Sequence, residues 1–241
     1  LINAKPYREW LHDNRLIFRK IKQSRSDPSF SLEELTRRMR AFGYTSETLE
    51  FMLLPMVHDL RDPLGSMGND SALAVLSDKQ RMLYDYFKQL FAQVSNPAID
   101  SIREKIIMSL ECYIGPEKNI LHPGEGHAHR LLVDHPILTS TALYALKHLD
   151  HEGHKSKVID ITFNISDSST EDLKTAVNRV CQQAEEAVDN GVGFLVLSDR
   201  SVNHEFAAIS SLMACGAVHH HLTKVAKRTK TAIIIETAEA R

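Results

Sequence analysis

Cysteine is scarce in this chain of 241 residues, which contains three, at positions 112, 181 and 215. An odd number of widely spaced cysteines without a CxxC pair argues against a disulfide framework and against a structural zinc site. Long apolar runs are also missing, since stretches such as 194–197 (FLVL) fall far below the roughly 20 residues of a membrane span. The sequence therefore predicts no membrane association and a reducing, cytoplasmic compartment.

A basic excess is missing as well. The chain has 29 Lys and Arg against 31 Asp and Glu, a formal net charge of −2. Proteins that neutralise a phosphate backbone need a surplus of positive charge, so nucleic acid is not an expected partner. With 43% hydrophobic and 25% charged residues, the composition is that of an ordinary globular protein. Because the chain starts at Leu1 rather than Met and lacks a signal-peptide pattern, we expect both termini to be cuts in a longer protein.

Helical signals dominate the first half. Ser31 and Glu34 form a capping box ahead of apolar residues at helical spacing, and Gly43 supplies a left-handed stop. A second helix is predicted from Ser46 to about residue 60, with a bend or restart at Pro55, which lacks a backbone donor.

Two more helices are predicted before residue 118. Ser77 and Gln80 form another capping box before the apolar residues of 83–91. A further helix is expected from Asp100 through Leu110.

The pattern changes beyond residue 118. Apolar, β-branched runs at 158–163, 193–197 and 231–236 alternate with helical patterns at 170–190 and 204–227. Strands that are apolar on both faces belong in a parallel sheet that is covered by helices. The sequence therefore predicts an α/β fold in which a helical N-terminal layer is followed by a βαβαβ portion.

The domain organisation follows from this change. We expect one domain over 1–241, with a mainly helical part at 1–118 and an α/β part at 119–241. A loop-rich passage from 121 leads to a helix at 139–149, and Gly191 is expected to end the helix at 170–190.

Histidine is the one anomaly of the composition, with 13 copies, ten of which fall in three clusters at 122–135, 148–154 and 219–221. The first cluster has no cysteine or carboxylate at a recognised ligand spacing, and the consecutive side chains of the third point roughly 100° apart on a helix, so no metal site is predicted. The cluster at 148, 151 and 154 is read as the end of a helix, where imidazole complements the dipole. No nucleophile motif and no dinucleotide fingerprint is present, so no catalytic or cofactor-binding residue is assigned.

Polar residues do gather at predicted strand ends. Ser198, Asp199 and Arg200 follow the second parallel strand, and Glu236 ends the third. The carboxyl ends of parallel strands lie at one edge of a sheet, where α/β proteins keep their sites. These four residues form either a binding site or a structural cluster of turn, cap and ion pair.

Several motifs carry a resemblance to a known family. They include 65–70 (GSMGND), 73–78 (LAVLSD), 84–94 (YDYFKQLFAQV), 197–200 (LSDR) and 217–222 (AVHHHL). On these motifs, together with shorter matches that extend to 236–241 (ETAEAR), the chain resembles the central domain of the glutamate synthase large chain over nearly its whole length.

The resemblance implies a multidomain enzyme that makes two glutamates from glutamine and 2-oxoglutarate, an oxidoreductase acting on CH-NH2 donors. An amidotransferase domain releases ammonia, and a domain with FMN and a 3Fe-4S cluster uses it, with electrons from a reductase subunit or ferredoxin. The central domain, which resembles a rudimentary TIM barrel, links the two. The resemblance therefore implies no cofactor in this segment and no activity of the segment alone.

An ammonia path is implied too, because ammonia that meets water is protonated and lost. Met67, Asn69, Ser95 and Asn96 stand in short loops, and small or flexible neutral side chains suit the wall of such a path. We expect these four residues to line or gate it, or else to close helix ends and dock the neighbouring domains.

Two other classes of function stay open. One is a free-standing barrel-type protein that binds a phosphate or flavin at Ser198, Asp199 and Arg200. The other is an interaction module whose apolar patches are covered by its neighbouring domains.

Overall fold

The computed structural model describes residues 4–21, 30–60, 76, 78, 81–87, 107–151, 153–166 and 171–239. The chain divides into two compact units. The sheet unit contains residues 1–28 and 99–237, and the helical unit contains 29–98 and 238–241. The expectation of one domain over 1–241, mainly helical to residue 118 and α/β from 119, stays a prediction.

A sheet with three parallel strands forms the centre of the sheet unit. Its order is β4 (Asp150–His151), β5 (His154–Asp160), β7 (Phe194–Ser198) and β9 (Ala232–Glu236). Strands β5, β7 and β9 run parallel, and β4 pairs with the start of β5 in an antiparallel hairpin. β7 is buried along its whole length, as its apolar run predicts.

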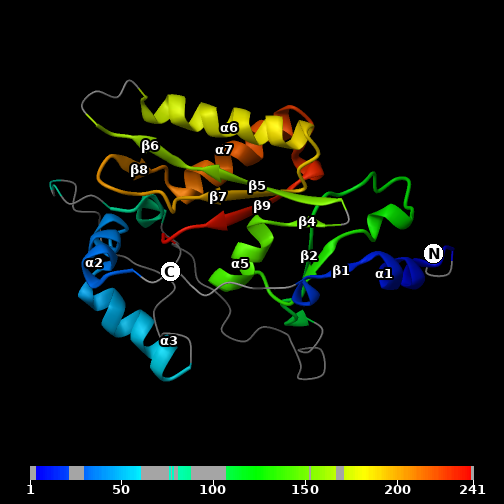
Figure 1. The fold of residues 1–241 in the computed structure, drawn as a ribbon, viewed down its shortest axis with the longest axis horizontal. Helices are drawn as coiled ribbons and strands as arrows, with labels where there is room; N and C mark the ends of the chain where they lie inside the picture. Colours follow the sequence, from blue (N-terminus) through cyan, green and yellow to red (C-terminus); the bar gives the residue numbers. More distant parts are fainter. Residues whose placement is uncertain are drawn as a thin grey trace. The chain divides into compact units, whose positions relative to one another are not determined.

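Helices cover both faces of this sheet (Figure 1). α6 (Leu173–Asp189) and α7 (Ser211–Lys224) lie on one face and pack against Leu195 and Leu197 of β7. α5 (Ser140–Lys147) lies on the other face and packs against Phe194 and Val196. The predicted βαβαβ order is confirmed, and the fold of this unit is mixed α/β.

Local signals fix the ends of α6. The carboxylate of Asp172 accepts a hydrogen bond of 2.7 Å from the Thr175 amide at the N-terminus. Gly191 has φ of +76°, and the amides of Gly191 and Val192 bond to the carbonyls of Val188 and Ala187. These two bonds form a Schellman motif, so the predicted stop at Gly191 is confirmed.

Two predicted boundaries are wrong. The predicted strand at 158–163 is two strands, β5 and β6 (Thr162–Asn164), of which β5 begins at His154. The predicted helix at 204–227 begins only at Ser211, because β8 (Phe206–Ala208) precedes it and pairs antiparallel with β6. The alanines of β8 favour a helix locally, and pairing with β6 overrides that preference.

A small mixed sheet was not anticipated. β1 (Leu16–Ile17) pairs parallel with β3 (Leu131–Val133), and β2 (Cys112–Ile114) pairs antiparallel with β3. The helix α1 (Tyr7–Asn14) precedes β1. The helix predicted from Asp100 to Leu110 falls mostly outside the described residues. Within the described part of the chain, no sheet closes into a barrel.

The helical unit contains α2 (Leu32–Ala41), the π-helical turn η2 (Thr48–Leu53), α3 (Leu54–His58) and the 3₁₀ turn η3 (Leu83–Tyr86). The hydroxyl of Ser31 accepts the Glu34 amide, and Gly43 has φ of +68°, so both predicted ends of α2 are confirmed. Pro55 stands in the first turn of α3, directly after the π-helical turn, which confirms the predicted restart.

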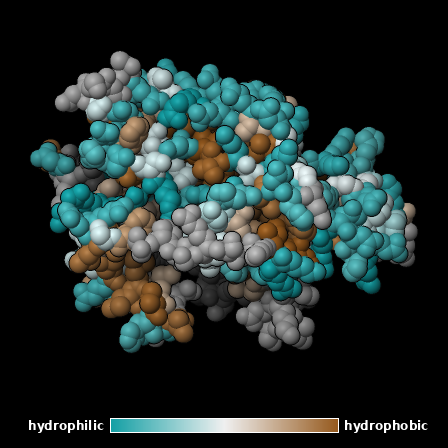
Figure 2. Space-filling view, in the orientation of Figure 1, coloured by the Kyte–Doolittle hydropathy of each residue, from teal (hydrophilic) through white to brown (hydrophobic). Residues whose placement is uncertain are grey.

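Apolar side chains gather on the surface over α3 (Figure 2). Phe51, Val57 and Leu60 are 65, 76 and 87% exposed, and Leu54 and Met56 are also exposed. These five residues are called the α3 patch below. Contiguous exposed apolar surface of this kind is typical of a face that binds another protein surface.

Candidate functional site

Three polar residues form a row at the carboxyl edge of the parallel sheet. Asp160 of β5 pairs in register with Ser198 of β7, and Ser198 pairs in register with Glu236 of β9. Register partners in a parallel sheet point to the same face. Since Val196 and Phe194 of β7 face α5, the three polar side chains stand on the α5 side of the edge.

Glu236 is the centre of a cluster of four residues. Nη1 of Arg200 donates to Oε1 of Glu236 at 2.9 Å. The Lys147 ammonium, from the last turn of α5, and the Ser198 hydroxyl both donate to Oε2. Lys147, Ser198, Arg200 and Glu236 are called the Glu236 cluster below. Its donors come from three elements, which are α5, the end of β7 and the loop that follows β7.

The side chains of the Glu236 cluster that make these contacts are largely buried, apart from Arg200. The side chains of Glu236 and Lys147 are 11 and 15% exposed, and Ser198 is 5% exposed. Burial by itself would raise the pKa of Glu236, but the hydrogen bonds from Lys147 and Ser198 and the charge of Lys147 outweigh it. The pKa of Glu236 therefore lies below its ordinary value, and the carboxylate is ionised at neutral pH.

Asp199 binds beside this cluster rather than in it. Its carboxylate accepts a hydrogen bond from the Thr237 hydroxyl, and its amide donates to the Glu236 carbonyl at 3.2 Å. Asp199 is buried, with 4% of its surface exposed. The loop after β7 is thus bonded to the end of β9 through both side chain and backbone.

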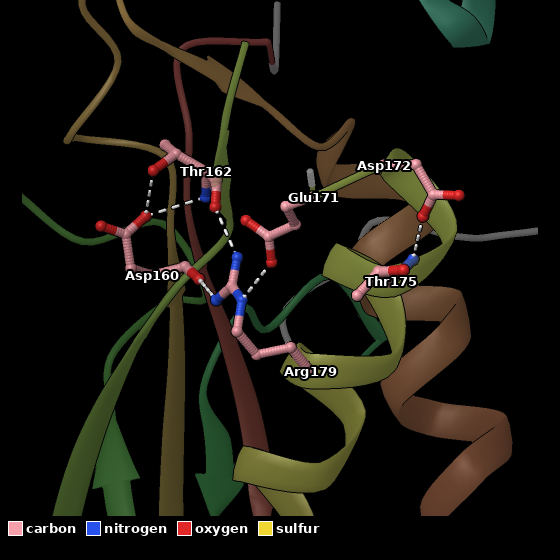
Figure 3. Close-up of polar contacts among 6 residues, drawn as sticks. All are labelled: Asp160, Thr162, Glu171, Asp172, Thr175 and Arg179. Carbon is pink, nitrogen blue, oxygen red and sulfur yellow. Dashed lines mark hydrogen bonds and ion pairs between the residues drawn. The ribbon is translucent and has the colours of Figure 1, made fainter. Parts of the chain in front are cut away.

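A second arginine braces the end of β5 (Figure 3). Nη2 of Arg179, on α6, donates to the carbonyl of Thr162 at 2.7 Å, and Nε donates to Glu171 at 2.8 Å. The carboxylate of Asp160 accepts both the amide and the hydroxyl of Thr162, at 2.8 and 2.7 Å. The turn between β5 and β6 is therefore held from inside by Asp160 and from α6 by Arg179.

The sequence predicted part of this site. Ser198, Arg200 and Glu236 are brought together, and Asp199 lies next to them, as expected for adjacent strand ends. Lys147 was missed, because a lysine in the last turn of a helix is ordinary and nothing in the sequence places α5 against β9. The predicted path residues Met67, Asn69, Ser95 and Asn96 lie outside the described residues.

In the Glu236 cluster, two charged donors and a hydroxyl bind one carboxylate. Both oxygens of Glu236 accept charged donors, so the carboxylate is held as an anion and is poorly suited to carry a proton. Within the described residues, no group of three or more His, Cys, Asp or Glu side chains is placed to hold a metal ion. In the same residues, each helix is too short or too polar to cross a membrane.

The histidine clusters of the sequence are divided in the fold. His148 caps α5, with Nδ1 2.9 Å from the Tyr144 carbonyl, as expected for the end of a helix. His154 instead begins β5, is buried, and stacks on His129 with ring centroids 4.4 Å apart. His221 pairs with Glu185 of α6 at 2.6 Å.

The cysteines are separated as well. Cys112 packs with the core on the α5 side of the sheet, whereas Cys181 lies in the core on the α6 and α7 side. Burial raises the pKa of Cys112, Cys181 and Cys215, so the thiols are held protonated. Cys181, which is 7% exposed, is a thiol of the core.

Comparison with known proteins identifies relatives of this chain. The family model described as "Glutamate synthase central domain" matches residues 37–241. "Glutamate synthase [NADPH] large chain" of Bacillus subtilis is 42% identical over 236 residues, which is 98% of this chain and 15% of that protein. "Glutamate synthase [NADH]" of Schizosaccharomyces pombe is 47% identical over 207 residues, 85% of this chain and 10% of that protein.

A relative of a third kind is similar to the same extent. "Ferredoxin-dependent glutamate synthase 2, chloroplastic" of Arabidopsis thaliana is 42% identical over 238 residues, 97% of this chain and 14% of that protein. The chain thus spans between 10 and 15% of the length of these three relatives.

Proposed function

Because the chain belongs to the glutamate synthase central domain family, we propose that it acts as the central domain of a multidomain glutamate synthase. Such an enzyme makes two glutamates from glutamine, 2-oxoglutarate and a reductant. The observation that carries the proposal is the similarity of the chain to glutamate synthases over nearly its whole length, 42% over 236 residues for the Bacillus subtilis protein.

The proposed role is connection rather than catalysis. The domain links an amidotransferase domain to a domain that binds FMN and a 3Fe-4S cluster, and it holds no cofactor itself. Two features support this role. The polar groups at the sheet edge already bind one another, and cysteines 112 and 181 lie in cores on opposite faces of the sheet, too separated to ligate one cluster.

The α3 patch supports the same role. Five apolar side chains exposed together suit a domain whose surface contacts other domains of its polypeptide. The parallel order of β5, β7 and β9, each joined by a helix, also resembles part of a TIM barrel. We propose the family's rudimentary barrel for this unit on that basis.

We also propose that an ammonia path runs along this domain. We place Met67, Asn69, Ser95 and Asn96 on its wall, from the character of their side chains. The electron donor of the whole enzyme, a reductase subunit or ferredoxin, is not specified by this domain, since relatives named for NADPH, NADH and ferredoxin are similarly identical to it. We propose a cytoplasmic location.

A chimera tests the connecting role. The chain would replace the matching segment of the Bacillus subtilis large chain, to which it is 42% identical. We expect the chimera to form glutamate from glutamine and 2-oxoglutarate. A chimera with normal flavin and iron–sulfur spectra and normal glutaminase activity, but without glutamine-dependent glutamate formation, would contradict the proposal.

The path is tested in the same chimera by Met67→Trp. A bulky ring on the wall of a narrow path should lower the ratio of glutamate formed to glutamine hydrolysed, by about tenfold or more. Met108→Trp is the matched control, because Met108 is an exposed methionine that belongs neither to the proposed path nor to the α3 patch. Equal coupling ratios in the two variants would remove Met67 from the path.

The alternative of a free-standing phosphate- or flavin-binding protein has less support. Ser198 and Arg200, which would bind the phosphate, already donate to Glu236. A titration of the purified chain with FMN distinguishes the two functions. Quenching of flavin fluorescence at micromolar protein would favour the alternative over the connecting role.

A further inference from the structure

We propose that Lys147, Ser198 and Arg200 form a binding pocket for a carboxylate and that Glu236 occupies this pocket as a built-in ligand. The pocket lies at the carboxyl edge of the parallel sheet, where α/β folds bind anionic ligands. This inference rests on the geometry of the Glu236 cluster alone and does not depend on the proposed function.

The donor set is that of a carboxylate site. A guanidinium, an ammonium and a hydroxyl converge on the two oxygens of one carboxylate. Charge-assisted hydrogen bonds of this kind are about twice as strong as neutral ones. Each oxygen of Glu236 receives at least one charged donor, so the site distinguishes a carboxylate from a neutral amide.

The Ser198 oxygen is held in place by contacts that do not involve the Glu236 carboxylate. Oγ of Ser198 accepts a hydrogen bond of 3.3 Å from the Arg200 amide. Because an ionised carboxylate only accepts hydrogen bonds, the hydrogen of this hydroxyl points toward Glu236. Ser198 is also held by β7, which pairs in register with strands on both sides. The Ser198 oxygen therefore keeps its position when the Glu236 carboxylate is removed.

The cations are positioned by separate elements. Lys147 extends from the last turn of α5, and the α5 core of Leu146 and Ala142 packs beneath it against β7. The Lys147 side chain is 15% exposed, so its charge is largely removed from water. Removal of Glu236 leaves this ammonium without the carboxylate that compensates its desolvation, which favours capture of another anion.

Replacement of Glu236 by alanine deletes a methylene and a carboxylate, which together match acetate apart from one hydrogen. The pocket in Glu236→Ala should therefore accept acetate from solution. We expect this variant to unfold about 10 °C below the wild type in sodium chloride. Sodium acetate at equal ionic strength should raise its Tm by at least about 3 °C, with half-saturation on the order of 10 mM.

Two further variants make the test specific. Glu236→Gln fills the pocket with an amide of the same shape, so acetate should stabilise it no more than chloride does. Lys147→Met combined with Glu236→Ala removes one cation, and the acetate effect should fall at least threefold. An equal acetate effect in Glu236→Ala and Glu236→Gln, or an undiminished effect in the double variant, would overturn the proposal.

A refolding experiment covers the case in which Glu236→Ala does not fold in chloride. The variant is diluted from urea into acetate or chloride, and its far-UV circular dichroism is recorded. Recovery of the helical signal in acetate but not in chloride supports the pocket. Failure to recover in acetate, under conditions in which Glu236→Gln refolds, overturns it.

Discussion

Ser198 and Glu236 are register partners at the carboxyl ends of β7 and β9, and the Ser198 hydroxyl donates to the Glu236 carboxylate. The same face of β7 carries Phe194 and Val196 in the core beneath α5. Alternation along the strand thus brings a serine onto the α5 face at the end of the sheet. At this edge of the sheet the Lys147 ammonium of α5 donates to the same carboxylate as Ser198. The apolar face therefore ends in a group of donors that binds an anion.

Acid should weaken the sheet unit through Glu236. Its pKa in the folded chain lies below the ordinary value of about 4.3, so the unfolded chain binds the proton more tightly. The stabilisation is complete above the unfolded pKa and is lost as the pH falls through the folded pKa. We expect the free energy of unfolding to decrease below about pH 5.

Glu236→Gln is the variant that isolates this effect. Urea unfolding between about pH 3 and 7 should show a smaller acid loss than in the wild type, because glutamine does not titrate. Glu185, whose hydrogen bonds from Lys227 and His221 lower its pKa, keeps part of the acid loss in both proteins. Identical pH profiles for the two proteins would exclude a linkage through Glu236.

Ala226 is expected to be a site of stabilisation by glycine. It follows the C-cap of α7 with φ of +56°, and the Lys227 amide bonds to the Leu222 carbonyl in a Schellman motif. The left-handed conformation costs a residue with a Cβ about 1–2 kcal/mol. Ala226→Gly should therefore raise the free energy of unfolding by about 0.5–1 kcal/mol in urea, after the greater freedom of unfolded glycine is subtracted.

The matched control lies in the same helix. Ala217→Gly, in the interior of α7, should lower the free energy of unfolding by about 1 kcal/mol or more, because glycine is a poor helix former. Replacement of alanine by glycine is thus expected to raise the free energy of unfolding at Ala226 and to lower it at Ala217. A loss at both would mean that Ala226 is not strained.

Gly193 should not tolerate a side chain. A Cβ at this position, just before β7, would lie 3.1 Å from both Cδ and Cγ of Pro116. A proline ring cannot turn away as a flexible side chain can, so strand or loop must shift. Gly193→Ala should lower the free energy of unfolding by about 1–3 kcal/mol in urea.

Gly216 provides the control for Gly193. A Cβ there meets nothing within 4 Å, and the residue lies inside α7. Gly216→Ala should raise the free energy of unfolding by up to about 1 kcal/mol. If both variants are destabilised equally, the contact with Pro116 is not the cause.

The sequence predicts the fold where the determinants are local. The ends of α2 follow from Ser31, Glu34 and Gly43, and the end of α6 follows from Gly191, because caps depend on residues within one turn. The succession of β5, β7 and β9 with helices between them followed from apolar, β-branched runs of strand length that alternate with helical patterns. Adjacent strand ends then predicted that Ser198, Arg200 and Glu236 would meet.

The predictions from the sequence fail where contacts between residues far apart in the chain determine the structure. β1 and β3 are two and three residues long, too short for any periodicity, and their pairing joins Leu16 to Leu131. β8 forms because β6 offers it a partner. Lys147 joins the site only because α5 packs on the sheet, a tertiary arrangement that no local pattern encodes.

Arg179 should contribute to stability through backbone carbonyls more than through its ion pair. Its side chain bonds the carbonyls of Thr162 and Asp160, at 2.7 and 3.4 Å, as well as Glu171. Arg179→Met keeps the apolar stem and removes these donors, so Thr162 loses a charge-assisted bond. We expect the free energy of unfolding to fall by about 1–2 kcal/mol in urea.

Lys174→Met is the control for charge, since Lys174 lies exposed on the same helix and its removal should change the free energy of unfolding by less than about 0.5 kcal/mol.

Glu171→Gln separates the ion pair from the carbonyl bonds, because it removes the charge partner of Arg179 and leaves the bonds to β5 and β6. A loss of under about 1 kcal/mol is expected there, since Glu171 and Arg179 are both partly exposed. If Glu171→Gln costs as much as Arg179→Met, the ion pair is the main contribution, and the turn between β5 and β6 does not depend on the arginine.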